Sequence, residues 1–310
     1  MKKGILKLFC LLAAMFLSAP CWAMEEIKIP MSVKSLSGTK TIYLSGTLYI
    51  PDGQGPFPLA VINHGIPFDE MKRKDTQRFK NQSKEFVERG FVVVVPMRRG
   101  YGTSEGDHAE GYGHCENPDY YSAGMESARD IKAAIDFMVQ RPYVDKSRIL
   151  LVGQSAGGFA ALAAVSLNPE GVVGVINFAG GRGAKKGGGV CSPDTLIWTV
   201  GELGRRSRIP TLWIYSENDK TVGPSLSREM REQYVKNGGN AKFVLLPPFM
   251  KDGHYLFRAE WIPVWTPIVD EFLQDLKLLE RKAEQPGRSG AGETVSLTAA
   301  AGLGILARVE

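Results

Sequence analysis

The sequence is poor in several features that would point to particular classes of protein. Its 310 residues include only four histidines and four cysteines, and none of these has the close ligand spacing of a metal site. The apolar run at residues 8–17 is about ten residues long, whereas a membrane span needs about 20. No internal repeat is present. We therefore expect a protein without a metal centre and without a membrane-spanning helix.

Residues 1–23 have the composition of a secretory leader. A lysine-rich start precedes the apolar run, and small residues precede Ala23, as at a signal-peptidase site. We expect the leader to be removed, so that the mature protein begins near Met24 and is secreted or periplasmic. The leader carries three lysines and no acidic residue, so its loss lowers the net charge from +5 to +2. Such a charge implies no nucleic-acid partner, and we expect no stable membrane association after cleavage.

Two of the four cysteines, Cys115 and Cys191, lie outside the leader. An even number of cysteines in an exported protein predicts a disulfide, and a bridge between these two would join two glycine-rich loops. Two free thiols are the alternative. Within the leader, Cys21 leaves lipid attachment as a second possibility, although Pro20 stands where such signals usually carry a small residue.

Short apolar runs rich in β-branched residues alternate with helical patterns through most of the chain. The runs predict strands buried on both faces, at residues 59–63, 91–96, 149–152, 172–177, 211–215 and 242–246. The patterns between them predict helices at residues 76–89, 122–140, 156–167 and 225–237, and a closing helix at 261–282. An alternating pattern over residues 27–50 predicts an opening antiparallel hairpin. This order is typical of the α/β class, with a mostly parallel sheet and helices on both faces.

The pattern also divides the chain. With 44% hydrophobic residues, the chain has enough material for one large core, and we expect a single domain over residues 24–282. Residues 283–310 are rich in Gly, Ala and Ser and have no helical charge pattern. We expect this tail to be largely disordered.

A Gly-x-Ser-x-Gly motif stands between a predicted strand and a predicted helix, at Gly153, Ser155 and Gly157. In that setting it is typical of a nucleophile elbow, a strained turn that lifts the serine hydroxyl above the sheet. The turn brings backbone segments too close together for side chains at the two glycines. The following helix adds the positive end of its dipole, and the backbone N–H of Ala156 can point at an oxyanion. Ser155 is the expected nucleophile.

A serine hydroxyl needs a base to take its proton and a carboxylate to orient that base. Three histidines precede Ser155 and only His254 follows it, which fits the chain order nucleophile, acid, histidine. Asp219, after the predicted strand 211–215, is the expected acid. Glu217 is the reserve, and Asp252 is expected to serve in the turn before the histidine.

The second oxyanion donor is expected from the loop after the predicted strand 59–63. Gly65 lets the backbone turn there, so that the N–H of Ile66 can face the Ser155 hydroxyl. We expect His64 to be a hydrogen-bonding residue of this loop rather than a second base.

A glycine-rich segment at residues 98–106 follows the predicted strand 91–96. Its glycine content alone would suggest a phosphate-binding loop. It lacks the Gly-Lys-Ser/Thr ending of such loops, however, and it opens no helix. We therefore expect this segment to pack against the oxyanion loop.

The chain resembles the dienelactone-hydrolase-like and prolyl-oligopeptidase-like branch of the α/β hydrolases in an ordered set of motifs: Asn63-His64-Gly65, Arg99-Gly100-Tyr101-Gly102, the Ser155 motif, Asp219 and His254. The likeness covers roughly residues 40–280. It implies the α/β-hydrolase fold, with a mostly parallel sheet of eight strands, and a Ser-His-Asp triad that needs no metal or organic cofactor. Dienelactone hydrolases proper use a cysteine nucleophile, so Ser155 argues against that activity.

These residues predict an acyl-transfer enzyme. We expect Ser155 to attack the carbonyl of a small-molecule carboxylic ester and form an acyl-enzyme that water releases. An ester is favoured because an alkoxide leaves more readily than an amine. A small aminopeptidase or amidase with the same triad is the alternative, and a catalytically inactive binding protein is a third hypothesis. Residues 180–203 are expected to shape the substrate pocket, with Trp198 on its wall.

Overall fold

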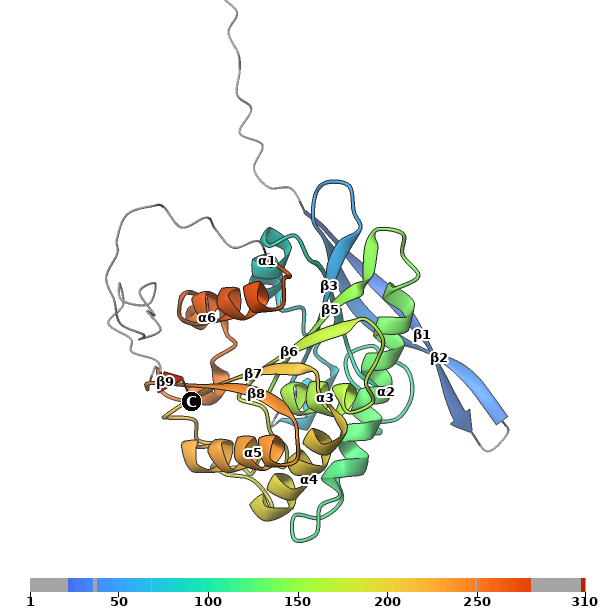
Figure 1. Ribbon diagram of the computed structural model, residues 1–310. Coiled ribbons are helices and arrows are strands. Elements are labelled where there is room, and N and C mark those ends of the chain that lie inside the picture. The colour runs from blue at the N-terminus through green and yellow to red at the C-terminus, as the bar shows by residue number, and fades with distance from the viewer. Residues whose placement is uncertain (1–21, 36–37, 68, 249, 280–307, 310) are drawn as a thin grey trace, which may run out of the picture.

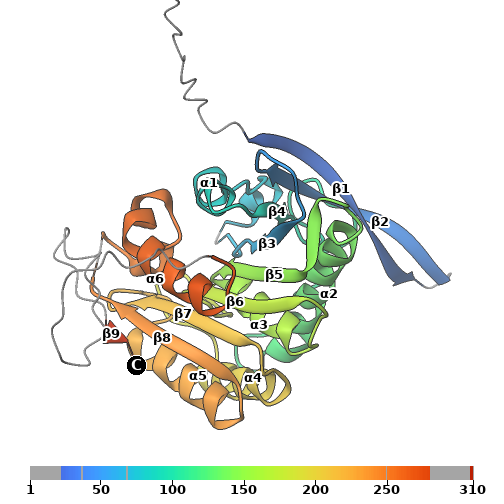
Figure 2. The ribbon, with the colours of Figure 1, turned by 45° about the horizontal axis from the view of Figure 1, so that its top comes forward.

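The computed structural model describes residues 22–35, 38–67, 69–248, 250–279 and 308–309. They build a nine-stranded sheet in the order β1-β2-β4-β3-β5-β6-β7-β8-β9 (Figures 1 and 2). The strands are β1 (Ala23–Ser35), β2 (Gly38–Ile50), β3 (Phe57–Asn63), β4 (Val92–Pro96), β5 (Val144–Gln154), β6 (Val172–Phe178), β7 (Pro210–Ser216), β8 (Asn240–Leu246) and β9 (Arg308–Val309). β3 to β8 run parallel, and the antiparallel hairpin of β1 and β2 joins them through β4. The eight expected strands are present as β1 to β8.

Helices cover both faces of the sheet, as expected. They are α1 (Lys80–Glu88), α2 (Tyr120–Met138), α3 (Ala156–Val165), α4 (Pro193–Arg206), α5 (Pro224–Lys236) and α6 (Ile262–Asp275), with short 3-10 helices η1 (Glu70–Lys74), η2 (Gly253–Tyr255) and η3 (Ala259–Trp261). α1 and α6 lie on one face, and α2 to α5 lie on the other (Figures 1 and 2). The fold is that of an α/β hydrolase.

The central strands are apolar because helices cover both of their faces. Every residue of β4 is buried, and so is every residue of β3 after the first. Valine and isoleucine suit these positions, since branched side chains pack well on a pleated surface. The parallel strands all end at one edge of the sheet, so the loops that follow β3, β5, β7 and β8 meet there.

The C-terminal tail differs from expectation at two residues. Arg308 and Val309 form β9, which pairs antiparallel with β8 through Leu245 and Val244, so these two residues are an exception to the disorder expected for most of the tail. The physical reason is that β8 would otherwise present unpaired backbone groups at the sheet edge. Residues 280–307 and 310 lie outside the described residues. So does the expected leader up to residue 21, and Ala23 already belongs to β1.

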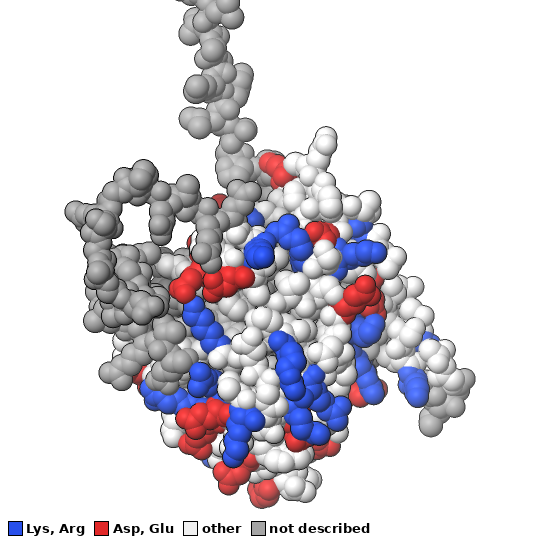
Figure 3. Space-filling view, in the orientation of Figure 1, with Lys and Arg blue, Asp and Glu red and all other residues white. Residues whose placement is uncertain are grey.

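None of the described helices is long and apolar enough to cross a membrane. On the face seen in Figure 3, positive and negative side chains are interspersed.

Candidate active site

Ser155 lies in a tight turn between β5 and α3. Its φ of 56° and ψ of −125° form a backbone conformation that costs a non-glycine residue about 1–3 kcal/mol. A Cβ added at Gly153 would lie 2.2 Å from the carbonyl oxygen of Gly157, and one at Gly157 would lie 2.1 Å from that of Asn63. Only glycine fits at either position. The motif thus reflects a steric requirement of the turn that presents Ser155 at the sheet edge.

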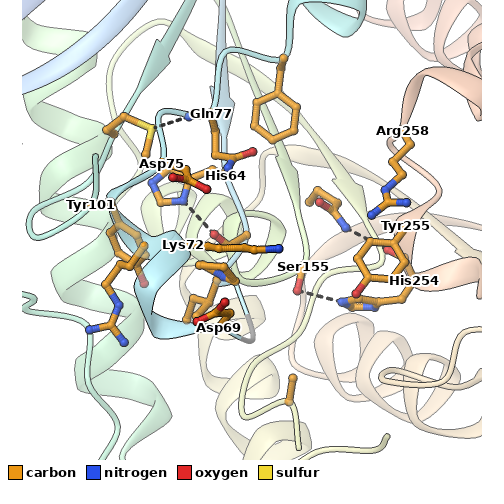
Figure 4. A pocket seen from close by; sticks show the side chains of 18 residues that line it. His64, Asp69, Lys72, Asp75, Gln77, Tyr101, Ser155, His254, Tyr255 and Arg258 are labelled. Carbon is orange, nitrogen blue, oxygen red and sulfur yellow. Dashed lines mark hydrogen bonds between the residues drawn. The ribbon is translucent and has the colours of Figure 1, made fainter. Parts of the chain in front are cut away.

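Side chains from three loops meet at this edge. Oγ of Ser155 lies 3.0 Å from Nε2 of His254, and Figure 4 shows the two side chains facing each other. On the other side of the ring, Nδ1 lies 3.1 Å from each carboxylate oxygen of Asp219. A neutral imidazole that donates its Nδ1–H to Asp219 leaves Nε2 free to accept the serine proton, which is the geometry of general-base catalysis.

The Asp219 carboxylate is held by its own loop. Its Oδ1 accepts hydrogen bonds from the backbone N–H groups of Thr221 and Val222, both at 2.8 Å. Asp219 is buried, and these amides supply part of the hydrogen bonding that a buried carboxylate needs. Glu217, the reserve candidate, is an exposed residue and is not the acid that the imidazole contacts.

Two further residues, Asp252 and Gln154, hydrogen-bond to the backbone of His254. Oδ1 of Asp252 accepts from the backbone N–H of His254 at 3.0 Å and from that of Lys220 at 3.1 Å, so it ties the histidine loop to the acid loop. Gln154 donates from Nε2 to the His254 carbonyl at 2.9 Å. We expected only a turn role for Asp252 and none for Gln154. No sequence signal shows these contacts, because they join residues 32 and 100 positions apart.

The loop after β3 passes directly over Ser155. A Cβ added at Gly65 would lie 3.2 Å from Cβ of Ser155 and 3.3 Å from the carbonyl oxygen of Gln154. Ile66 and Ala156, which carry the two expected oxyanion donors, both line a cavity beside Ser155. The backbone of this loop and the start of α3 therefore flank the hydroxyl from two sides.

Ser155 stands between two cavities. One of about 400 Å³ lies on the side of His254 and is also lined by Tyr255 and Arg258 (Figure 4). The other, about 360 Å³, contains Ala156 and residues 181–184 instead of the histidine.

The segment 180–203 shapes the site only through its first residues. Residues 181–184 and Lys186 line the second cavity. The segment then leads into α4, which packs in the helical layer with a buried apolar face, Leu196, Val200 and Leu203. Trp198 is on the opposite face of α4 and is 60% exposed. Its predicted place on the pocket wall is wrong, because the helical period turns it away from the core.

Cys115 and Cys191 form a disulfide, with their Cα atoms 4.9 Å apart. It joins the loop between β4 and α2 to the segment before α4, and both of these line the second cavity. Within the part of the chain that the structure describes, no group of three or more His, Cys, Asp or Glu side chains is arranged to hold a metal ion.

A buried group of charges lies beneath the loop that follows β3, and no pattern in the sequence indicated it. Arg98, Glu110 and Arg182 are all almost fully buried. Burial alone would raise the pKa of the Glu110 carboxyl, but the guanidinium groups of Arg98 and Arg182 hold that pKa well below its usual range. Arg98 belongs to the glycine-rich segment 98–106, which was expected to pack against this loop.

Residues 40–255, which contain Ser155, Asp219 and His254, match the family model of the X-Pro dipeptidyl-peptidases, the S15 family. The chain belongs to the S15 family. This S15 family member is 25% identical over 201 residues to dipeptidyl peptidase family member 6 of Caenorhabditis elegans, which covers 61% of the chain and 23% of that protein. The chain spans less than half the length of the curated relatives it matches.

Solved structures resemble this S15 family member in fold. An esterase of Pyrococcus furiosus matches with a TM-score of 0.58 at 14% identity, covering 82% of this chain and 90% of the other. A protein of Klebsiella pneumoniae assigned as a dienelactone hydrolase matches with a TM-score of 0.54 at 14% identity, covering 82% and 99%. At such identities the likeness shows the fold alone. Together with the family match it confirms the predicted superfamily.

Proposed function

We propose that this protein is an exported serine hydrolase that cleaves carboxylic esters of small molecules. The observation that carries the proposal is the continuous contact from Ser155 Oγ to His254 Nε2 at 3.0 Å and from His254 Nδ1 to Asp219 at 3.1 Å. The strained backbone of Ser155 supports it, since a fold retains such strain where the exposed side chain has a use.

In the proposed reaction, Oγ of Ser155 attacks the ester carbonyl carbon while Nε2 of His254 takes the hydroxyl proton. The carbonyl π electrons move to oxygen, and the N–H groups of Ile66 and Ala156 stabilise the resulting oxyanion. When the tetrahedral intermediate collapses, the bond to the alcohol oxygen breaks and His254 gives that oxygen its proton. Water then attacks the acyl-enzyme by the same route, which releases the acid and restores the Ser155 hydroxyl.

The two cavities suggest how a substrate lies. The leaving group must be within reach of His254, which protonates it, so it is assigned to the cavity of about 400 Å³ that contains this residue. The acyl group is assigned to the cavity of about 360 Å³ beside Ala156.

Peptide hydrolysis is the second candidate, because the family match is to X-Pro dipeptidyl-peptidases and a curated relative is a dipeptidyl peptidase by name. Ester cleavage is preferred here on chemical grounds, since an alcohol leaves more readily than an amine. Turnover of p-nitrophenyl acetate and of a panel of aminoacyl- and dipeptidyl-p-nitroanilides ranks the two activities. A higher kcat/KM on a dipeptidyl anilide than on every ester tested would reverse the preference.

The central test is Ser155→Ala. We expect its hydrolysis of p-nitrophenyl acetate to fall by several powers of ten, and labelling by a fluorophosphonate probe to be lost. Ser225→Ala, at an exposed serine on α5, is the matched control and should keep both. Retained ester hydrolysis in Ser155→Ala would refute the proposal, and failure of the wild-type enzyme to react with the probe would favour the inactive binding protein.

Export is part of the proposal, supported by the leader-like residues 1–23 and by the disulfide, since disulfides persist in oxidising compartments. The measured mass of the protein recovered outside the cytoplasm should correspond to a chain that begins near Met24. A full-length mass, or a lipid-modified one, would contradict leader cleavage at this point.

A further inference from the structure

An ion pair is buried beneath the loop that carries the Ile66 amide. Nε and Nη2 of Arg98 donate to the two carboxylate oxygens of Glu110 at 2.7 and 3.1 Å. The same carboxylate accepts from the hydroxyls of Tyr101, at 2.6 Å, and Ser127. Both oxygens are therefore fully engaged, and the guanidinium of Arg98 is held in one orientation.

Arg98 in turn contacts His64 twice. Its backbone N–H donates to Nε2 of the His64 ring at 3.2 Å, and its Nη1 donates to the His64 carbonyl oxygen at 2.8 Å. The imidazole must therefore be neutral, with its proton on Nδ1. Burial and, second, the charge of Arg98 lower the pKa of His64 from 6.5 to about 3, which agrees with this protonation state at neutral pH.

The remaining nitrogen of His64 reaches the next peptide unit. Nδ1–H donates to the carbonyl oxygen of Gly65 at 2.8 Å. That carbonyl and the N–H of Ile66 belong to one planar trans peptide, so they point in opposite directions. Fixing the carbonyl thus fixes the direction of the N–H. Gly65 packs against Ser155, with its Cβ position 3.2 Å from Cβ of the serine.

We propose that this chain of contacts, from Glu110 through Arg98 to His64, positions the oxyanion amide of the site. The three are positioning residues, because only His64 contacts the Gly65 carbonyl, and Arg98 and Glu110 act through His64. The inference rests on the proposed function, since it assigns a direction to a group that the proposed reaction uses. Ion pairs buried this deeply often add little net stability, so their effect on orientation is the one to measure.

Two near-isosteric substitutions at His64 separate this role from a general structural one. In His64→Asn the side-chain amide nitrogen can take the place of Nδ1 and still donate to the Gly65 carbonyl. In His64→Gln the polar end reaches the place of Nε2, so the contact with Arg98 is kept and the one with Gly65 is lost. On p-nitrophenyl acetate we expect kcat to fall about a hundredfold in His64→Gln, but only a few-fold in His64→Asn.

The affinity for an inhibitor that forms an oxyanion in the site tests the direction of the Ile66 amide specifically. An alkyl trifluoromethyl ketone forms a tetrahedral adduct with the Ser155 hydroxyl. The oxyanion of this adduct is stabilised when the Ile66 N–H points toward it. Its affinity should fall in His64→Gln by about the same factor as kcat, with KM nearly unchanged. Equal losses in the two His64 variants, or a loss confined to KM or to the melting temperature, would overturn the inference.

The neighbouring arginine supplies a second, independent comparison in case the His64 variants do not fold. Arg99 is also held by buried and half-buried carboxylates, Asp130 at 2.6 Å and Glu126 at 2.8 Å, but it faces α2. Arg98→Lys should weaken inhibition by the trifluoromethyl ketone at least tenfold, and Arg99→Lys should leave it unchanged. The same loss in both would overturn the inference. Ester hydrolysis by Ser155→Ala would refute the proposed function, whereas an inactive Ser155→Ala beside a fully active His64→Gln would refute only the positioning role.

Discussion

The half of the site built by β7 and β8 is held differently from the half built by β3 and β4. On the first side, backbone amides hold Asp219, and the half-buried Asp252 ties its loop to that of His254. On the second side, the loop with Ile66 rests on the buried pair of Arg98 and Glu110.

This difference follows from what each half is proposed to do. The histidine has to gain and lose a proton in every turnover, so its neighbours must tolerate a change of charge. The oxyanion amide has to stay in one direction, and groups whose charge does not change at neutral pH suit that task. A single sheet edge can therefore combine two parts that are held differently. The part built by β7 and β8 is called the proton-transfer half below, and the part built by β3 and β4 is called the static half.

The largest effect should come from the proton-transfer half. Asp219→Asn keeps the size of the side chain but loses the charge that stabilises the imidazolium and selects its tautomer. We expect kcat on p-nitrophenyl acetate to fall by about 10³ to 10⁴. Glu217→Gln, two residues away and exposed, is the control and should stay within about twofold. A large loss in the control and little in Asp219→Asn would return the role to the reserve acid.

The next effect concerns the rim of the static half, where Cys115 and Cys191 close a loop across 76 positions. Replacing both cysteines with serine should lower the free energy of unfolding by about 2–4 kcal/mol, measured by denaturant titration. Fluorophosphonate labelling of Ser155 should persist in the folded variant, because neither cysteine is among the residues that line the two cavities at Ser155. A reducing agent should destabilise the wild-type protein and leave the variant unaffected; equal effects on both would contradict this account.

The smallest effect is on pH dependence and tests whether the static half keeps one protonation state. The pKa of His64 is lowered from 6.5 to about 3 in the folded protein. Between these two pH values, the unfolded chain therefore binds a proton at His64 that the folded chain does not bind. Stability is therefore lost as the pH falls below about 6.5. From pH 7 to pH 5, the free energy of unfolding should fall by about 2 kcal/mol more in the wild-type protein than in His64→Asn.

Other titrating groups do not obscure this comparison. The pKa of Glu110 is held well below 4.5, so its contribution to stability is present above about pH 4.5 and is lost only in stronger acid. The pKa of His108 is also lowered, mainly by burial, but this residue is common to both proteins and cancels. Parallel stability curves for the two proteins between pH 7 and pH 5 would show that His64 is protonated in the folded state.

Much of the fold could be predicted because its signals are local. Buried runs such as the valines of β4, and the glycines that flank Ser155, show their requirements within a few residues. The segment 180–203 was expected to shape the pocket, but most of it forms α4, because an amphipathic pattern does not show which part of the structure covers its apolar face. β9 was not predicted because two residues are too few to show an alternating pattern of hydrophobicity. They form a strand because they pair with the edge of β8.

The sequence by itself determined the tight, glycine-flanked turn at Ser155 and the alternation of strands and helices. These follow from steric limits and periodicities that act over short stretches of chain. Only the tertiary structure decided which distant groups hold them: Asp252 between two loops, Gln154 behind His254, and Glu110 beneath Arg98. The physical reason is that such contacts depend on the directions of side chains from separate strands, which are set when the sheet assembles and the core is packed.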